Sequence, residues 1–313
     1  MEFEIKEFEE GKEYEKIQAE LYSAAIAEYG GAPIKEEDIK QRNEYYKKQE
    51  MTKRNQKYAF DKEGKPLAYL QYQVYNFGEE ENVFIGYPWS IPECPPEVQE
   101  VLFDDLFKEM TEKFPTDEIF MGYIDSKFIK AHEFAKAHGF EQDDFSIMYS
   151  MNMKKIASVE TPSFSSRVFN EDDIDLLVEI GLKDKDIKQQ FDEKGMKSYF
   201  TDRVFKHSMG IILLKEDEII GATAPLRDFT QGQETLARFV ALSEGYEQFL
   251  PELLIHLARY CGEKGTDDQN LIINLPKDRI FKNEFVEKAD IVEKRRIIRY
   301  RKKLVEKVTD FKN

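Results

Sequence analysis

Hydrophobic and polar positions follow one another along the chain in blocks that predict strands and amphipathic helices. Residues 56–75 and 210–229 each read as two apolar strands around a charged turn. Residues 95–114 carry an apolar position every fourth residue, which predicts an amphipathic helix with Pro96 in its first turn. A matching helix is expected over residues 251–265, where Pro251 opens the pattern.

These elements occur twice, in the same order. Leu67 matches Ile220 and Phe134 matches Phe285, so the two copies are offset by about 150 residues. We therefore predict two copies of one α/β domain, over residues 1–156 and 163–313. A segment at about 157–162 contains Ser, Thr and Pro and is expected to be the linker. The alternative is one large domain whose pattern repeats by coincidence.

Composition and charge narrow the class of protein. The chain has 313 residues, 41% of them apolar, and a formal net charge of −16. This charge favours solubility and disfavours a nucleic-acid partner, because phosphates would be repelled. Cys94 and Cys261 lie far apart without metal-ligand spacing. The start of the sequence is highly charged and lacks the apolar region of a signal peptide, and no apolar run approaches the length of a membrane span. We expect a cytoplasmic protein with free thiols, no membrane partner and no metal.

The stretch "AHEFAKAHGF" carries the most specific motif. Ala131, Phe134, Gly139 and Phe140 fall where the GNAT superfamily of N-acetyltransferases has A-x-x-F-Y-e-k-x-G-F after its fifth strand. Lys136 and Ala137 occupy the loosely held e-k positions and do not match them. With the order of elements, the chain resembles two tandem GNAT-like (acyl-CoA N-acyltransferase) domains. The resemblance implies an α/β fold in which each domain is a mixed, mostly antiparallel sheet flanked by helices.

The resemblance also implies a place for acetyl-CoA. In the GNAT family the fourth and fifth strands splay apart, and the pantetheine arm binds backbone groups of strand four. Carried over to this chain, the cofactor-binding backbone would be that of Phe84, Ile85, Gly86, Tyr87, Phe239, Val240, Ala241 and Leu242.

Two chemical features of the family are missing in both halves. The phosphate-binding loop would fall on residues 94–99 and 245–250, which lack the family's glycines, and Pro95 and Pro96 carry no N–H for a phosphate. The tyrosine that serves the family as general acid is replaced by Ala135 and Val286, neither of which can transfer a proton. The catalytic residues therefore stay unassigned.

Three functions remain open on this basis. One half could transfer an acyl group from acyl-CoA to an unknown small-molecule or peptide amine, with Glu81 or Glu234 as the only candidate bases; both also suit exposed loop carboxylates. Alternatively, the scaffold could be a non-catalytic binding or regulatory module. A transferase that uses aminoacyl-tRNA as donor is disfavoured by the negative charge.

One basic cluster stands out at residues 293–307, with Arg296, Arg299, Arg301, Lys302 and Lys303. It could bind a phosphate. It also suits a last strand near a sheet edge, where basic side chains prevent pairing with other molecules, and we favour this second interpretation.

Overall fold

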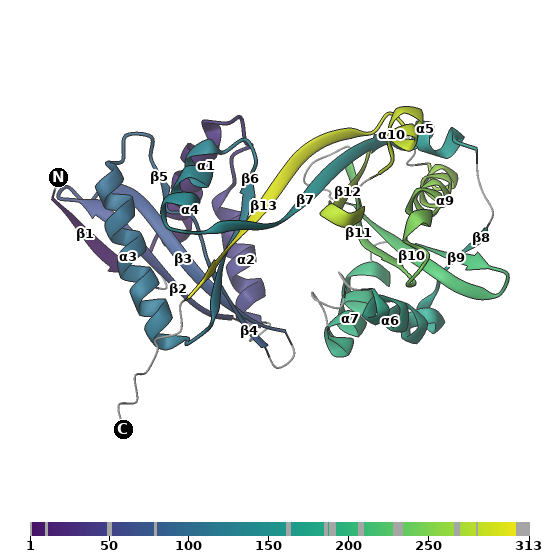
Figure 1. Cartoon of the computed structure of the whole chain (residues 1–313), viewed down its shortest axis with the longest axis horizontal. Helices are drawn as coiled ribbons and strands as arrows, with labels where there is room; N and C mark the ends of the chain where they lie inside the picture. The colour runs from purple at the N-terminus through teal and green to yellow at the C-terminus, as the bar shows by residue number, and fades with distance from the viewer. Residues whose placement is uncertain are drawn as a thin grey trace, which may run out of the picture. The chain divides into compact units, whose positions relative to one another are not determined.

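The computed structural model describes residues 2–9, 12–48, 52–77, 80–160, 164–184, 187, 192–205, 210–227, 234–265, 270–279 and 281–304. The chain forms two compact units, each described here by itself (Figure 1). Unit 1 comprises residues 1–144 and 298–313, and unit 2 comprises residues 145–297.

Unit 1 is a sheet covered by helices on both faces (Figure 1). Its strand order is β1-β2-β3-β4-β6-β13, where β13 (Val292–Lys303) is divided between the two units, and β5 pairs with β3. The elements are β1 (Phe3–Glu7), α1 (Tyr14–Ala27), α2 (Glu36–Lys48), β2 (Thr52–Asp61), β3 (Pro66–Phe77), β4 (Glu80–Ile85), β5 (Trp89–Ser90), α3 (Pro96–Lys113), β6 (Glu118–Asp125) and α4 (Ile129–Ala137).

Two separate apolar clusters hold the helices of unit 1 to its sheet. The predicted stripe of α3, which includes Leu102 and Leu106, packs with Leu70 and Val74 on one face of the sheet. On the other face, α1 packs through Tyr14 and Leu21 against aromatic residues of β2 and β3 (Tyr58, Phe60, Tyr69). Because side chains alternate along a strand, β3 contributes residues to the apolar clusters on both faces of the sheet.

Unit 2 repeats the plan with the strand order β7-β12-β11-β10-β9-β8. Its elements are β7 (Glu141–Asn152), α5 (Met153–Ser158), β8 (Ser165–Val168), η1 (Glu171–Asp173), α6 (Ile174–Lys183), α7 (Glu193–Tyr199), η2 (Phe200–Val204), β9 (Ile211–Lys215), β10 (Glu218–Arg227), β11 (Glu234–Leu242), η3 (Glu247–Phe249), α9 (Leu250–Glu263), β12 (Asn270–Pro276), η4 (Lys277–Arg279), α10 (Asn283–Lys288) and β13 (Val292–Lys303).

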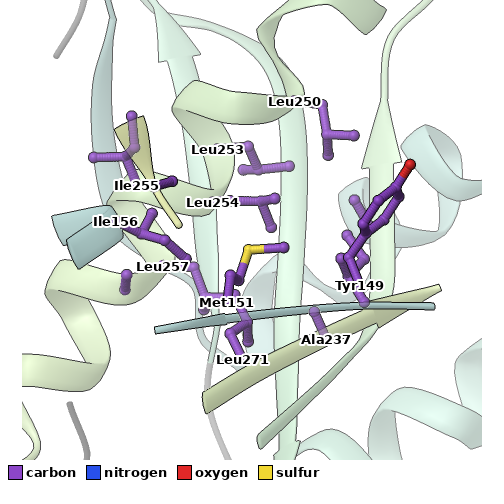
Figure 2. Packing of buried hydrophobic residues seen from close by; sticks show 14 of the residues in the cluster. Tyr149, Met151, Ile156, Ala237, Leu250, Leu253, Leu254, Ile255, Leu257 and Leu271 are labelled. Atoms are coloured by element: carbon purple, nitrogen blue, oxygen red, sulfur yellow. The ribbon is translucent and has the colours of Figure 1, made fainter. Parts of the chain in front are cut away.

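Helix α9 contributes more residues to the largest core of unit 2 than any other element does. Leu253, Leu254 and Leu257 pack against Met151 of β7 and Leu271 of β12 (Figure 2). The opposite face of the sheet is covered by α6 and α7, whose apolar side chains meet Ala222, Ala224, Phe239 and Ala241. The small alanines let these helices lie close to the strands.

The last strand of each sequence half contributes to the other unit. Most of β7 belongs to unit 2, where it pairs antiparallel with β12 from Asn270↔Asn152 to Pro276↔Ser146. The end of β13 belongs to unit 1, where Leu304 N donates to Asp117 O at 2.8 Å. The bounds of the compact units therefore differ from those of the sequence halves predicted at 1–156 and 163–313.

The segment predicted as a linker includes part of a helix and is attached to α9. Arg259 donates to the carbonyls of Ala157 and Val159, at 3.1 and 3.2 Å. Glu252 accepts from Phe164 N at 2.8 Å, and His256 lies 2.8 Å from Ser166 Oγ. Glu252, His256 and Arg259 follow one side of α9, so this polar stripe fixes the chain on both sides of residues 161–163.

Candidate functional site

The two parallel strands β11 and β12 separate part-way along their length in unit 2. Their pairing runs from Glu234↔Asn270 to Ala237↔Ile273 and then stops. The register of β11 against β10 shifts at the same level, between Ala224 and Pro225. Beyond this bulge, Phe239–Leu242 still pair with β10 but no longer with β12. A bulge that redirects a strand is a frequent feature next to functional sites.

A buried ion pair occupies the widened end of this gap. Asp184, directly after α6, accepts from Leu242 N at 3.2 Å and from Arg279 of η4 at 2.8 Å. Its other oxygen accepts from Ile187 N at 3.2 Å. The Asp184 and Arg279 side chains are 0% and 6% exposed, so the pair is far from water and its attraction is strong. The Asp184 carboxylate thus accepts a hydrogen bond from the N–H of Leu242, the last residue of β11.

A cavity of about 520 Å³ lies next to this pair, and Arg279 forms part of the cavity wall. Two short segments form most of its wall: residues 247–252 with Ile255, and residues 281–285 with Lys288. The apolar lining includes Phe249, Phe281 and Phe285, and Lys282 and Lys288 add positive charge beside four glutamates (Glu160, Glu247, Glu252, Glu284). Its size suits a drug-sized ligand or part of a cofactor.

Three successive positions at the start of α9, Phe249, Leu250 and Pro251, offer no free amide to this cavity. Phe249 N donates to Tyr246 O at 2.9 Å, and Leu250 N donates to Glu247 O. Pro251 has no N–H. Gln248 donates its side-chain amide to Gly245 O at 3.1 Å, which closes the turn further. An anion at this helix start would therefore depend on side chains more than on backbone.

The corresponding gap in unit 1 is filled by protein side chains. Within the part of the chain that the structure describes, β4 pairs with β6 at Phe84↔Phe120 and Ile85↔Met121, and it is followed by residues 86–88 and then β5. Tyr87 is buried there against Phe128 and Phe134, with ring centroids 5.0 and 5.5 Å away.

Gln99 of α3 completes the closure. Its Nε2 lies 2.8 Å from Pro88 O, 3.0 Å from Ser90 Oγ and 3.2 Å from Tyr87 Oη. The carbonyl that faces the gap is thus satisfied from within the chain. Burial raises the pKa of Tyr87, so its hydroxyl stays protonated at neutral pH.

Comparison with solved structures identifies the architecture. A GCN5-related N-acetyltransferase from Sphaerobacter thermophilus is 12% identical with a TM-score of 0.69, covering 96% of this chain and 95% of that chain. A tandem GNAT protein from the clavulanic acid biosynthesis pathway gives 10% identity and a TM-score of 0.66 over 96% of this chain and 98% of its own. The chain has a tandem GNAT fold. No family model matches the sequence, and no curated protein matches it.

A third GNAT structure, an acetyltransferase from Colwellia psychrerythraea, is 12% identical with a TM-score of 0.59 and covers 96% of this chain and all of its own. The likeness confirms the predicted fold class of tandem GNAT-like domains. At such low identity it identifies the fold, and substrates have to be argued from the site itself.

Within this GNAT fold, the eight predicted strand-four residues fall into three situations. Phe84 and Ile85 pair with β6, and Gly86 N donates to Gln71 O at 2.9 Å. Tyr87 lies in the aromatic filling. Phe239, Val240, Ala241 and Leu242 lie beyond the pairing with β12. Binding of acetyl-CoA to this backbone stays a prediction.

In both units, the residue that replaces the family's tyrosine has apolar surroundings. Ala135 is fully buried in the core of unit 1, and Val286 packs against the core of unit 2. Burial raises the pKa of the Cys94 thiol to about 11, so this thiol stays protonated at neutral pH. The side chains of the two candidate bases, Glu81 and Glu234, lie outside the described residues.

The basic cluster of β13 is not on an edge strand, since β13 has β6 on one side and β7 on the other. The favoured interpretation was therefore wrong, because the strand exchange places β13 inside the sheet order. Arg299 pairs with Asp143, Arg296 pairs with Glu293, and Lys302 donates to His138 O at 2.8 Å. These partners account for charges that the sequence left open for a phosphate.

Asp184 and Arg279 were missed by sequence reasoning. Asp184 begins the run "DKDIK", which has the composition of an exposed charged segment. Arg279 lies 95 residues later. No spacing or motif links them, so only the fold brings them together.

Within the described residues no helix is both long and apolar enough to cross a membrane, and no group of three metal-ligating side chains occurs.

Proposed function

We propose that the protein binds an acyl-CoA through unit 2 and transfers its acyl group to an amine. The observation that supports this most is the cavity between residues 247–252 and 281–285, which shares Arg279 with the ion pair on the N–H of Leu242 in β11. The GNAT fold agrees with this placement, and one of the neighbouring tandem GNAT proteins is described in its form without AcCoA.

The lining fits a coenzyme in part. Phe249, Phe281 and Phe285 offer apolar surface to an adenine or a pantetheine arm. Lys282 and Lys288 can neutralise phosphates, although Lys288 already pairs with Glu284 at 2.8 Å. The turn contributes few amides, and Glu247 adds repulsion, so we expect affinity in the high micromolar range rather than the nanomolar range. When bound, the coenzyme would supply the activated thioester.

The protein's own contribution at the reacting end would come from Leu242 N and the groups around it. A backbone N–H in a dry site can hold a thioester carbonyl and stabilise the charge that develops on it. Asp184 occupies this N–H in the structure. Acyl transfer therefore requires that the carboxylate moves aside.

The hydrogen bond from Leu242 N to Asp184 supports a second function, that of a non-catalytic binding module. If Asp184 stays on Leu242 N, a coenzyme could fill the cavity while its thioester has no place beside β11. The absence of an acidic side chain at Ala135 and Val286 agrees with this alternative.

Calorimetric titration with acetyl-CoA, combined with a thiol-release assay, tests both. We expect one binding event that is weakened at least several-fold by Lys282→Glu, through charge reversal at the cavity wall. Lys130→Glu in unit 1 is the matched control and should leave binding unchanged. Binding with thiol release in the presence of an amine supports the transferase, and binding without it supports the module. Absence of binding at millimolar acetyl-CoA would refute both.

A further inference from the structure

Helices α1 and α2 of unit 1 carry a group of buried polar atoms that no described residue satisfies. Gln18 Oε1, Asn43 Oδ1, and Nε and Nη2 of Arg42 are shielded from solvent and have no hydrogen-bond partner among the described residues. Arg42 as a whole is half-buried, but burying two N–H-bearing atoms of a guanidinium without hydrogen-bond acceptors costs stability. Such groups in a native structure require an explanation, and a missing ligand is one.

The three residues lie at one level of the helix pair. Asn43 Nδ2 donates to Glu15 Oε1 at 3.4 Å, which joins α2 to α1. Arg42 precedes Asn43, and Gln18 lies three residues beyond Glu15, roughly 5 Å further along α1. The unsatisfied atoms therefore flank a single contact between the two helices.

An amide-rich floor lies beneath this level. Gln18 Nε2 points to Gln71 Oε1 at 3.5 Å, and Gln56 donates to the same oxygen at 3.1 Å. Tyr58 in turn donates to Gln56 Oε1 at 2.8 Å. Gln18 is 0% exposed, so its free carbonyl oxygen is held in place by this network while lacking a donor of its own. The floor is rigid and polar where the rest of this face of the sheet is aromatic.

The chemistry of the free atoms defines the ligand. Nε and Nη2 form the side-on edge of a guanidinium, which binds a carboxylate through two parallel hydrogen bonds. The oxygens of Gln18 and Asn43 require donors, as an ammonium group would provide. Glu15 disfavours a ligand with excess negative charge, such as a phosphate dianion.

From this set we infer that unit 1 contains a binding site for a zwitterionic amino acid between α1 and α2. Arg42 would hold the carboxylate, and the amide oxygens of Gln18 and Asn43 would hold the ammonium group. The site belongs to unit 1 and is independent of the coenzyme function proposed for unit 2.

Thermal unfolding of the full chain tests the inference. The probes are the twenty common amino acids, each added singly at millimolar concentration, with acetate and inorganic phosphate as partial probes. We expect the melting temperature to rise with concentration for at least one amino acid, because a ligand of the native state stabilises it. Acetate and phosphate should give a much smaller rise.

Two variants separate a ligand site from a structural role. Arg42→Met removes the desolvated charge, so it should hold or raise the melting temperature of the ligand-free protein and weaken amino-acid binding at least roughly tenfold. Gln18→Leu should weaken binding as well. Arg167→Met, which removes an exposed arginine that pairs with Asp173, should leave binding unchanged. The inference fails if no amino acid raises the melting temperature, or if the rise survives in both Arg42→Met and Gln18→Leu.

Discussion

At the scale of single residues, the pattern of apolar positions does not predict which charged side chains are buried. Lys57 is buried on β2 and contacts Asp105 and Glu109 of α3, at 2.6 and 2.8 Å. Asp184 and Arg279 form a second buried pair in unit 2. The sequence predicts the apolar stripe of α3 correctly, yet it gives no sign that charged residues on the same helix face inward.

The pH dependence of stability should reflect Glu109. Burial alone would raise the pKa of Glu109, but hydrogen bonds from Lys113, Lys57 and Asn55 outweigh it and lower the pKa to about 2. The lowered pKa stabilises the fold above the ordinary value of 4.5, and this contribution is lost as the pH falls from 4.5 to about 2.

Glu109→Gln should therefore destabilise unit 1 by about 2 kcal/mol at pH 7 and by much less near pH 2. Chemical denaturation at several pH values measures this. Glu112→Gln, an exposed neighbour on α3, is the control. An equal loss of stability at both pH values would contradict the assignment of the stabilisation to the ionised carboxylate.

A double-mutant cycle tests the buried pair in unit 2. Arg279→Met should cost about 3 kcal/mol, because it leaves the Asp184 carboxylate buried without its cation. Adding Asp184→Asn should recover part of this loss, since the amide is neutral and can still accept from Leu242 N. Additive losses in the double variant, measured by urea denaturation, would show that the two side chains do not interact.

At the scale of elements, the sequence predicts types and order well and pairing partners poorly. The hairpins around residues 61–65 and 215–218, the helices α3 and α9, and the strands β6 and β12 all occur where the pattern places them. Local periodicity determines such elements. The exchange of β7 and β13 could not be predicted, because the apolar alternation of a strand does not say which edge it joins.

Removal of β13 should therefore weaken the protection of unit 1, most of which lies far from β13 in the sequence. Deleting residues 292–313 leaves β6 without its neighbour and exposes Asp117 O, which accepts from Leu304 N. We expect amide exchange in β6 to accelerate by at least about tenfold. Deleting only residues 305–313 is the control. Unchanged protection of β6 in the longer deletion would rule out the exchange.

Tyr300 gives this exchange a specific anchor. Its hydroxyl lies 2.8 Å from Nδ1 of His132, and Nε2 of the same imidazole lies 2.9 Å from Asp125 O. Because a carbonyl only accepts, the imidazole must donate from Nε2 and accept from Tyr300. Burial lowers the pKa of His132 and so favours this neutral form. Tyr300 of β13, near the end of the sequence, is thus fixed to His132 of α4.

At the scale of the whole molecule, two copies of one fold have diverged in different places. Unit 1 closes the gap beside β4 with Gln99 and aromatic rings, and carries unsatisfied polar atoms on α1 and α2. Unit 2 has the cavity beside α9 and α10 and carries a buried ion pair at the end of β11. The net charge of −16 is consistent with both ligands being small molecules rather than nucleic acid.

Hydrogen exchange with and without acetyl-CoA, read by mass spectrometry at peptide resolution, tests the central claim most directly. The account predicts slower exchange in residues 247–255 and 281–288 of unit 2 and no change in residues 94–103 and 129–137 of unit 1. Slower exchange confined to the segments of unit 1, or no change in either unit at saturating acetyl-CoA, would contradict it.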